Sequence, residues 1–242
     1  MDTQSRGRTE QPSIARCIDI SAVRAQHAES DVRKLAEYAR SGNFINAHVL
    51  PNWVPLLREL LAGSDTLVGS PVGFPGGAHA TPIKVAEAEW LLGAGVQEVD
   101  AVMNIGRLRS GDDAYVRREL EALREVIPQD IPLKVIFETS LLSADEIRRG
   151  SALAVESRFD FVKTGTGWTG VPIDLDTVRL IREVVGDALA IKAVGGLHDL
   201  DTVLAFQSEL GVERFGIGVD GAVAILEEER RRRGADAEVG AR

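Results

Sequence analysis

Short hydrophobic runs alternate with longer amphipathic segments along most of the chain. The runs are rich in Val, Ile, Leu and Phe, a composition typical of strands that are buried on both faces. The predicted strands cover residues 16–20, 45–50, 66–72, 96–104, 133–138, 159–164, 189–194 and 213–218. The segments between them carry apolar residues at helical spacing. The predicted helices cover residues 30–39, 53–61, 82–92, 114–126, 143–155, 174–185 and 199–210, and a last one begins near Gly221.

Local signals support several of these boundaries. Ser143 and Glu146 have the spacing of a capping box, in which two side chains satisfy free backbone N–H groups at a helix start. Pro82 suits the first turn of its helix, because the N–H that proline lacks has no helical partner there. Gly42 follows the first helix as a stop signal. These signals mark where individual helices in the alternating pattern begin and end.

Strand and helix alternate eight times without a break in composition, which predicts a single α/β domain, a closed (β/α)8 TIM barrel. A doubly wound sheet is the alternative that the same pattern allows. The barrel is expected to cover residues 14–226. Residues 1–13 are polar and predict a disordered arm. Residues 227–242 carry blocks of like charge, which predict a charged, solvated tail that frays.

Composition narrows the class of protein. A length of 242 residues with 44% hydrophobic residues is normal for one barrel. The formal charge of −9 argues against nucleic acid or an anionic membrane as a partner. Cys17 is the single cysteine, so an internal disulfide framework is excluded and a reducing compartment is indicated. The sequence contains neither a secretory signal nor a long apolar run, so we expect a cytoplasmic location.

Two lysines end strand-like runs and carry the candidate chemistry. Lys163 follows four residues of a hydrophobic run and precedes a Gly/Thr-rich turn, and Lys192 repeats the arrangement about thirty residues later. Desolvation lowers the pKa of a lysine, and two neighbouring lysines each disfavour the other's charge. A neutral amine of this kind condenses with carbonyl groups. The alternative is that each lysine merely extends its amine to water at a strand end.

In a (β/α)8 barrel the active site lies at the carboxyl ends of the strands. The strand assignment places Asp19, His48, Asp100, Lys163 and Lys192 near those ends, each from a different strand. Two lysines and two aspartates that converge in one barrel mouth indicate an enzyme rather than a binding protein. The predicted reaction is imine formation, followed by proton transfer and carbon–carbon bond chemistry.

The same motifs resemble those of the deoxyribose-phosphate aldolase family of class I, Schiff-base-forming aldolases. The resemblance extends over about residues 16–226 and has several ordered parts. The matching segments are residues 161–167 around Lys163, 191–196 around Lys192, 72–78, 98–106 and 133–139.

The resemblance implies roles for individual residues. It implies that Lys163 is the Schiff-base lysine, that Asp100 and Lys192 form the proton relay, and that Asp19 is a further active-site acid. The implied reaction is the reversible cleavage of 2-deoxyribose 5-phosphate to acetaldehyde and glyceraldehyde 3-phosphate, without a metal or organic cofactor. The predicted substrate-binding residues are Asp19, Ser21, His48, Thr164, Gly167, Gly195, Gly196, Gly218 and Asp220.

The chain departs from the family pattern at the phosphate end. The family uses a Ser-Gly-Gly turn and then a pair of serines, whereas this chain has Val194-Gly195-Gly196 and Val219-Asp220-Gly221. Backbone N–H groups can still bind an anion, but hydroxyl donors are lost. The carboxylate of Asp220 would repel a phosphate, or it would cap the last helix. These changes predict little or no preference for phosphorylated over unphosphorylated aldehydes.

Three further departures accompany this one. Ser21 stands in a changed strand-one motif. His48 and Leu50 stand where the family usually has cysteine and asparagine or tyrosine, and Gly165 replaces a serine in the turn after Lys163. His48 is either a substrate contact and third titratable group, or a core histidine bound to a backbone carbonyl. Together the changes suggest the same lysine chemistry on a different acceptor aldehyde.

Rival functions have less support. The four histidines share no ligand spacing, which argues against a zinc-dependent aldolase. No nucleotide-binding glycine motif follows a strand. The alternatives that remain are an aldolase acting on a non-phosphorylated substrate, another Schiff-base lyase, dehydratase or cyclase, and a non-catalytic barrel. The predicted partner is a small aldehyde or sugar, with a homodimer as a possible assembly.

Overall fold

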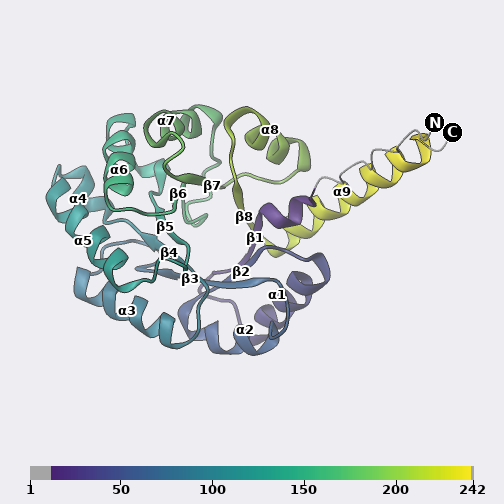
Figure 1. Cartoon of the computed structure of the whole chain (residues 1–242), viewed down its shortest axis with the longest axis horizontal. Coiled ribbons are helices and arrows are strands. Elements are labelled where there is room, and N and C mark those ends of the chain that lie inside the picture. The colour runs from purple at the N-terminus through teal and green to yellow at the C-terminus, as the bar shows by residue number, and fades with distance from the viewer. Residues whose placement is uncertain (1–11, 241–242) are drawn as a thin grey trace, which may run out of the picture.

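The computed structural model describes residues 12–240, except for the side chains of residues 236–240. Eight parallel strands follow one another in sequence order and close into a barrel, and helices surround it (Figure 1). The predicted single (β/α)8 barrel is therefore confirmed, and the doubly wound sheet is excluded. The strands are β1 Ile18–Ala22, β2 Asn46–Val49, β3 Leu67–Val72, β4 Glu98–Val102, β5 Leu133–Ile136, β6 Phe161–Lys163, β7 Ala190–Val194 and β8 Arg214–Gly218.

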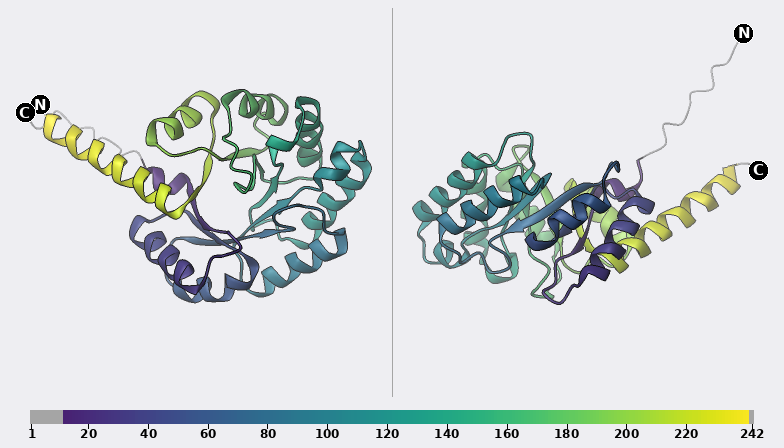
Figure 2. Two further views of the ribbon diagram at one scale, coloured as in Figure 1. Left: turned by 180° about the vertical axis from the view of Figure 1, so that it is seen from behind. Right: turned by 90° about the horizontal axis from the view of Figure 1, so that it is seen from below.

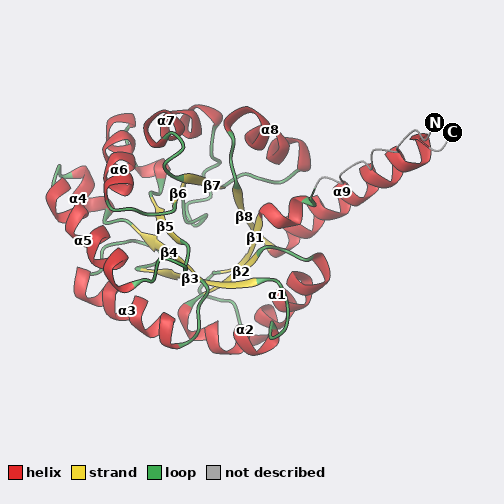
Figure 3. Ribbon diagram, in the orientation of Figure 1, coloured by secondary structure: helices red, strands yellow, loops and turns green. Residues whose placement is uncertain are grey.

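The helices lie on the outside of the barrel, one or more after each strand (Figure 3). The α-helices are α1 Glu29–Gly42, α2 Val54–Leu60, α3 Thr81–Gly93, α4 Ile105–Arg109, α5 Asp113–Val126, α6 Ala144–Glu156, α7 Leu175–Val185, α8 Leu200–Leu210 and α9 Val219–Gly240. Three short 3-10 helices, Ile14–Cys17, Pro51–Trp53 and Thr139–Leu141, complete the set. No helix within residues 12–240 is both long and apolar enough to cross a bilayer.

Capping residues explain where several helices begin. Ser143 accepts a hydrogen bond from the N–H of Glu146 and Glu146 reaches back to Ser143, so the predicted capping box is present at α6. Asp174 and Asp199 accept N–H bonds in the same way at α7 and α8. Each such cap is worth roughly 0.5–2 kcal/mol. The short helix α4 was not predicted, because five residues show too little of the helical period.

The hydrophobic core fills the layer between barrel and helices. Strand residues such as Val135 and Ile191 point outward into it and are completely buried. Helix residues such as Leu120 and Ile181 meet them from the other side. Burying one such side chain contributes about 1.5–3 kcal/mol. The apolar layer is continuous around the barrel, so the charged residues of the interior lie in a rigid frame.

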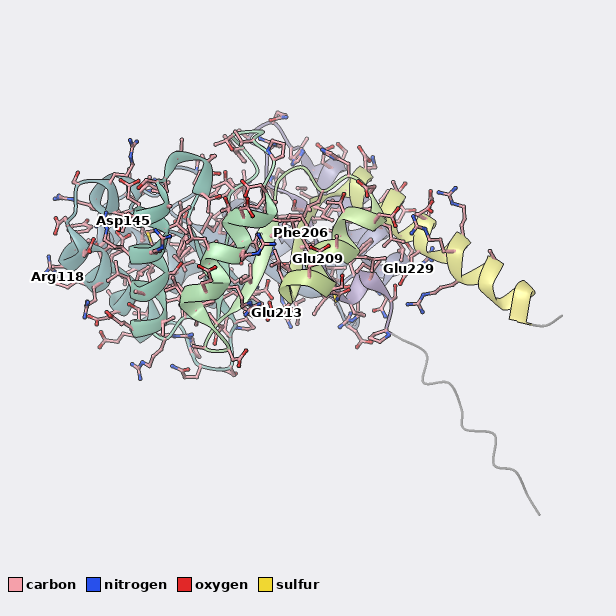
Figure 4. The ribbon with its side chains drawn as sticks, turned by 90° about the horizontal axis from the view of Figure 1, so that it is seen from above. Arg118, Asp145, Phe206, Glu209, Glu213 and Glu229 are labelled. Carbon is pink, nitrogen blue, oxygen red and sulfur yellow. The ribbon has the colours of Figure 1, made fainter. Side chains whose placement is uncertain are left out.

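The C-terminal segment is the main correction to the predicted organisation. Residues 227–240 continue α9 as a helix that extends away from the barrel (Figure 2), and residues 230–235 on it are exposed. At the base of this extension Glu229 is buried and accepts hydrogen bonds from the side chain of Ser13 and the N–H of Ile14, at 2.6 and 2.9 Å (Figure 4). These bonds tie the start of the described chain to the last helix. Residues 1–11 of the predicted arm lie outside the described residues.

Candidate active site

A cavity of about 480 Å3 opens at the carboxyl ends of the strands. Lys163 ends β6, whereas Asp19, Asp100 and Lys192 lie within their strands and project into the barrel. Asp100 has no exposed surface and lies beneath the two lysines rather than on the cavity wall. The predicted site residues that line the cavity are Asp19, Ser21, His48, Lys163, Gly167, Lys192, Gly195, Gly196, Gly218 and Asp220.

The two lysines share one carboxylate. Lys163 and Lys192 are register partners on the adjacent strands β6 and β7. The Nζ of each lysine lies 2.8 Å from Oδ2 of Asp100 on β4, across the barrel mouth. Sharing a single oxygen holds the two amines close together at the bottom of the cavity.

The surroundings of the two lysines make them chemically unequal. Burial lowers the pKa of Lys163 to about 8, with Asp100 opposing this effect and the charge of Lys192 adding to it. Burial also acts on Lys192, but Asp100 and Asp19 outweigh it and raise the pKa of that ammonium. Mutual depression of both pKa values was predicted, and it is wrong for Lys192. One lysine is poised to be neutral, and the other is held as a cation.

Charge balance gives a second reason for a neutral Lys163. The interior ion-pair cluster contains three carboxylates, Asp19, Glu98 and Asp100, and four cationic side chains, Lys134, Lys163, Lys192 and Arg214. With every group ionised, the cluster would hold one buried positive charge in excess. Burying an unpaired charge is costly. Deprotonating Lys163 removes the excess, and Lys163, at 8% exposure, is the most exposed lysine of the cluster.

Three members of the cluster, Glu98, Lys134 and Arg214, were missed by the sequence analysis. Arg214 donates to Oδ1 of Asp19 at 2.7 Å through Nε and to Glu98 at 3.1 Å. Lys134 contacts Glu98 and is the register partner of Asp100. The available signal was strand periodicity. Glu98 is two residues before Asp100 and so lies on the same face of β4.

His48 belongs to the same interior layer. Its Nδ1 lies 2.6 Å from Oδ1 of Asn46, and its Nε2 lies 3.3 Å from Oδ2 of Asp100. The partner is therefore a side chain, and the predicted bond to a backbone carbonyl is wrong. A Cβ at Gly69 on β3 would lie 2.2 Å from the imidazole. Glycine at that position leaves the space that the ring occupies.

The turn after Lys163 is held by a buried acid. Glu138 has a left-handed φ of 53°, and its carboxylate accepts a bond from the N–H of Thr166 at 3.1 Å and contacts the Thr166 hydroxyl. A Cβ at Gly165 would lie 2.7 Å from Oε1 of Glu138, so glycine leaves room for this acid. Thr164 bonds the backbone of Val194 and lines a smaller cavity of about 90 Å3. This smaller cavity shares Gly167 and Val194 with the larger one, and the substrate contact of Thr164 stays a prediction.

Three loops meet above the cavity. Arg24, after β1, donates to the carbonyl of Gly167 at 2.7 Å and lies 5.7 Å from the ring centre of Trp168. Trp168 Nε1 donates to the carbonyl of Val23 at 3.0 Å. Phe74, after β3, packs edge-on against the same indole at 5.5 Å. These contacts join loops from both sides of the barrel mouth and restrict its width.

The outer wall carries an exposed ion pair. Lys34 on α1 lies 2.9 Å from Asp220, and both residues line the cavity. Asp220 is the second residue of α9, so it lies inside the first turn and does not occupy the predicted capping position. Its carboxylate is compensated by the ammonium of Lys34, a partner that the sequence analysis did not anticipate.

Comparison with known proteins agrees with this geometry. No family model matches the chain. A deoxyribose-phosphate aldolase of Sinorhizobium medicae is 52% identical over 214 residues, which cover 88% of this chain and 86% of that protein. A protein of the same name from Klebsiella pneumoniae is 43% identical over 218 residues, covering 89% and 87% of the two chains. The chain belongs to the deoxyribose-phosphate aldolase family.

Solved structures of this family have the same architecture. A chain from Coccidioides immitis that is provisionally given the family name superposes with a TM-score of 0.85 at 31% identity, covering 91% of this chain and 88% of that one. The deoxyribose phosphate aldolase of Aeropyrum pernix, described as a unique tetramer, gives 0.78 at 26% identity and covers 90% and 91%. This member of the deoxyribose-phosphate aldolase family is a lyase with the family's barrel.

Among the residues that the structure describes, one group has atoms close enough together for a metal ion. Ligand atoms of Asp19, His48 and Glu98 lie within 4.8 Å of one another. The two carboxylates already contact the ammonium or guanidinium groups of Lys192, Lys134 and Arg214. These positive charges would repel a divalent cation, and they already neutralise the carboxylates that would have to bind it. The arrangement suits an aldolase that works through an amine.

Proposed function

We propose that this enzyme catalyses the reversible cleavage of 2-deoxyribose 5-phosphate into acetaldehyde and glyceraldehyde 3-phosphate through an imine on Lys163. The observation that carries the proposal is the unequal lysine pair on one carboxylate. Lys163, with a pKa of about 8, can be a neutral nucleophile, while Lys192 beside it stays charged. The names of the relatives support the substrate.

The first half of the reaction forms the imine. The lone pair of Lys163 Nζ attacks C1 of the open-chain sugar, and the carbonyl oxygen takes up a proton. Loss of this oxygen as water gives a protonated imine, which carries the positive charge on nitrogen. Lys192 is the cation at the same carboxylate and can supply protons to the oxygen that leaves.

The second half breaks the carbon–carbon bond. A base removes the proton of the C3 hydroxyl, the C2–C3 electron pair moves toward the iminium, and glyceraldehyde 3-phosphate leaves. The remaining enamine takes a proton at C2, and water releases acetaldehyde and the free amine. Because Asp100 lies beneath the lysines, its protons pass through Lys192 or a water molecule.

A second candidate is the same chemistry on an unphosphorylated sugar aldehyde. The observation that favours it is the turn after β8, where Gly218, Val219 and Asp220 supply no hydroxyl donor and one carboxylate. The two candidates share every step at Lys163. They differ only in what the outer wall of the cavity binds.

The test is reductive trapping. Acetaldehyde with borohydride should modify Lys163 alone, as mapped by peptide mass analysis, and Lys163→Ala should abolish labelling and cleavage. Lys34→Met is the matched control, since it removes a lysine from the outer wall and should leave trapping unchanged. Labelling that persists in Lys163→Ala would place the nucleophile elsewhere. A homodimer and a cytoplasmic location stay predictions from the sequence.

A further inference from the structure

We infer that Lys34 is a specificity-determining residue: its ammonium binds the anionic end of the substrate, and Asp220 holds it in place and competes with that anion. The inference rests on the proposed function and names the side chain that selects a phosphate ester. It also removes the conflict between a phosphorylated substrate and a carboxylate in the turn after β8.

The location follows from barrel topology. Strands β1 and β8 are neighbours, with Ser21 in register with Gly218, so the elements that follow them share one wall of the cavity. In barrels of this kind the loops after the seventh and eighth strands are a frequent phosphate site. Here those loops present Gly195 and Gly196, with φ of 109° and 71°, and the backbone near Gly218. Lys34 is bonded to Asp220 in the first turn of α9, which directly follows β8.

Most other basic side chains of the cavity make bonds elsewhere, and His198, in the loop after β7, is the further basic residue that lines it. Lys163 and Lys192 share Asp100 on the floor. Arg24 donates to the carbonyl of Gly167, on the side of β6. Nδ1 of His27 accepts a bond from the N–H of Arg24. Lys34 is thus the lysine placed beside the turns after β7 and β8.

Donor chemistry favours a lysine at this place. Ser21 is the hydroxyl residue of the adjoining strand, and its Oγ already points at the carbonyl of Ile217, 3.5 Å away. An ammonium on a flexible four-carbon stem has three donors and can turn from a carboxylate to a phosphate without moving the backbone. The exposed fractions of the Lys34 and Asp220 side chains, 50% and 89%, leave both free to make that exchange.

Substitutions of Lys34 and Asp220 can distinguish a role in anion binding from a purely structural role, because the two roles predict different results. If Lys34 binds the anion, Lys34→Met removes the ligand and Asp220→Asn removes its competitor. If the pair only fastens α1 to α9, both changes break the same bond and act alike. The measured quantity is the ratio of kcat/KM for deoxyribose 5-phosphate to kcat/KM for deoxyribose.

We expect Lys34→Met to lower this ratio on the order of tenfold, the effect of one lost charge-assisted bond at a wet site. Asp220→Asn should raise it about threefold, and the double variant should behave like Lys34→Met. Arg33→Met is the control, because Arg33 is the preceding residue, carries the same charge and pairs with Glu29 instead. Inorganic phosphate should inhibit deoxyribose cleavage about tenfold more weakly in Lys34→Met.

Equal shifts in Lys34→Met and Asp220→Asn, or an effect of Arg33→Met as large as that of Lys34→Met, would overturn the inference. Acetaldehyde trapping on Lys163 involves no phosphate and should persist in all four variants. If Lys34→Met leaves the ratio of kcat/KM values unchanged while acetaldehyde still traps Lys163, only the role of Lys34 is refuted. Failure of trapping in the unmodified enzyme removes the proposed function itself.

Discussion

The floor and the outer wall of the cavity use ion pairs in different ways. On the floor, Asp100 contacts both lysines and His48, and all of these groups are buried. On the wall, Lys34 and Asp220 form one pair that water surrounds. A buried charge must be matched by several partners, since removing one leaves the others unpaired at a cost of about 3–5 kcal/mol. An exposed pair is worth at most ~1 kcal/mol and can be exchanged freely.

This difference accounts for the departures from the family at the wall, but not for His48, which lies on the floor beside Asp100. The motifs around Lys163, Lys192 and Asp100 match the family motifs, and a change of any of these three residues would leave buried charges unpaired. The departures at Asp220 and Val219 lie at the wall, where a new carboxylate needed only one partner, Lys34. The chemistry is thus fixed by the floor, and the choice of substrate can change at the wall.

The largest effect should come from Asp100→Asn, which breaks the floor. Proton exchange at the methyl carbon of acetaldehyde should slow by about 10²–10⁴-fold, because the proton relay loses its carboxylate. Imine trapping should continue, because the carboxylate of Asp100 raises the pKa of Lys163 and its removal favours the neutral amine. The free energy of unfolding should fall by about 3–5 kcal/mol, since Lys192 and Lys134 lose a buried partner.

The control for this prediction is Asp145→Asn, an exposed acid of α6 that pairs with Arg149 (Figure 4). It should change stability by less than about 0.5 kcal/mol and leave exchange unaltered. An unchanged exchange rate in Asp100→Asn would remove Asp100 from the relay.

The next largest effect concerns the pH dependence of activity, which tests whether Lys163 and Lys192 differ in pKa. The neutral form of Lys163 is the active one, so kcat/KM should rise with pH through about 8 and level off above it. The cation of Lys192 lowers the pKa of Lys163, so Lys192→Met should move the rise to higher pH. At pH 7 the variant should be slower by about ten- to a hundredfold, in line with a shift of one to two pH units. A rise that stays near pH 8 in the variant would show that burial alone sets the pKa.

The order of strands and helices was predictable, because the apolar runs of a parallel barrel are short, continuous and regularly spaced. Strand ends were less certain. For β4, residues 96–104 were predicted and Glu98–Val102 are observed, although the N–H groups of Gln97 and Met103 still donate to neighbouring strands. The helical course of residues 227–240 was missed because like-charge blocks normally indicate a frayed end. The i,i+4 pair of Glu228 with Arg232 balances part of that charge.

At the site, the sequence could not predict which charged side chains pair with each other when they lie far apart along the chain. The sequence shows that Lys163 and Lys192 are alike and adjacent, and it cannot show that Asp19 contacts only one of them. That contact adds to the effect of Asp100 on the pKa of Lys192, and together they make the two lysines unequal. In the same way, nothing local to Asp220 indicates Lys34, which lies 186 residues away. Pairings between elements this distant depend on the closure of the barrel.

A smaller effect is expected from a substitution in the turn that follows Lys163. Gly165→Ser restores the residue usual in the family, but its Cβ would lie 2.7 Å from Oε1 of Glu138. We expect a loss of about 1–3 kcal/mol in the free energy of unfolding, the usual cost of overpacking, and partial rescue by adding Glu138→Ala. Gly93→Ser is the control, because its Cβ would meet no atom within 4 Å. Equal stability of Gly165→Ser and Gly93→Ser would mean that Glu138 moves away readily.

The smallest predicted effect is that of salt concentration, which should weaken the exposed ion pair of the wall and leave the buried ion pairs of the floor unchanged. The Debye length falls from about 10 Å at 0.1 M salt to about 3 Å at 1 M, which screens exposed charges and leaves buried ones nearly unaffected. The preference for deoxyribose 5-phosphate over deoxyribose should therefore fall a few-fold across this range. The pH midpoint set by Lys163 should stay within about 0.3 unit, because its partners Asp100 and Lys192 have almost no contact with solvent. In Lys34→Met the phosphate preference should lose much of its salt dependence. If salt moves the pH midpoint as strongly as the preference, the floor is open to ions and the two regions do not differ as described.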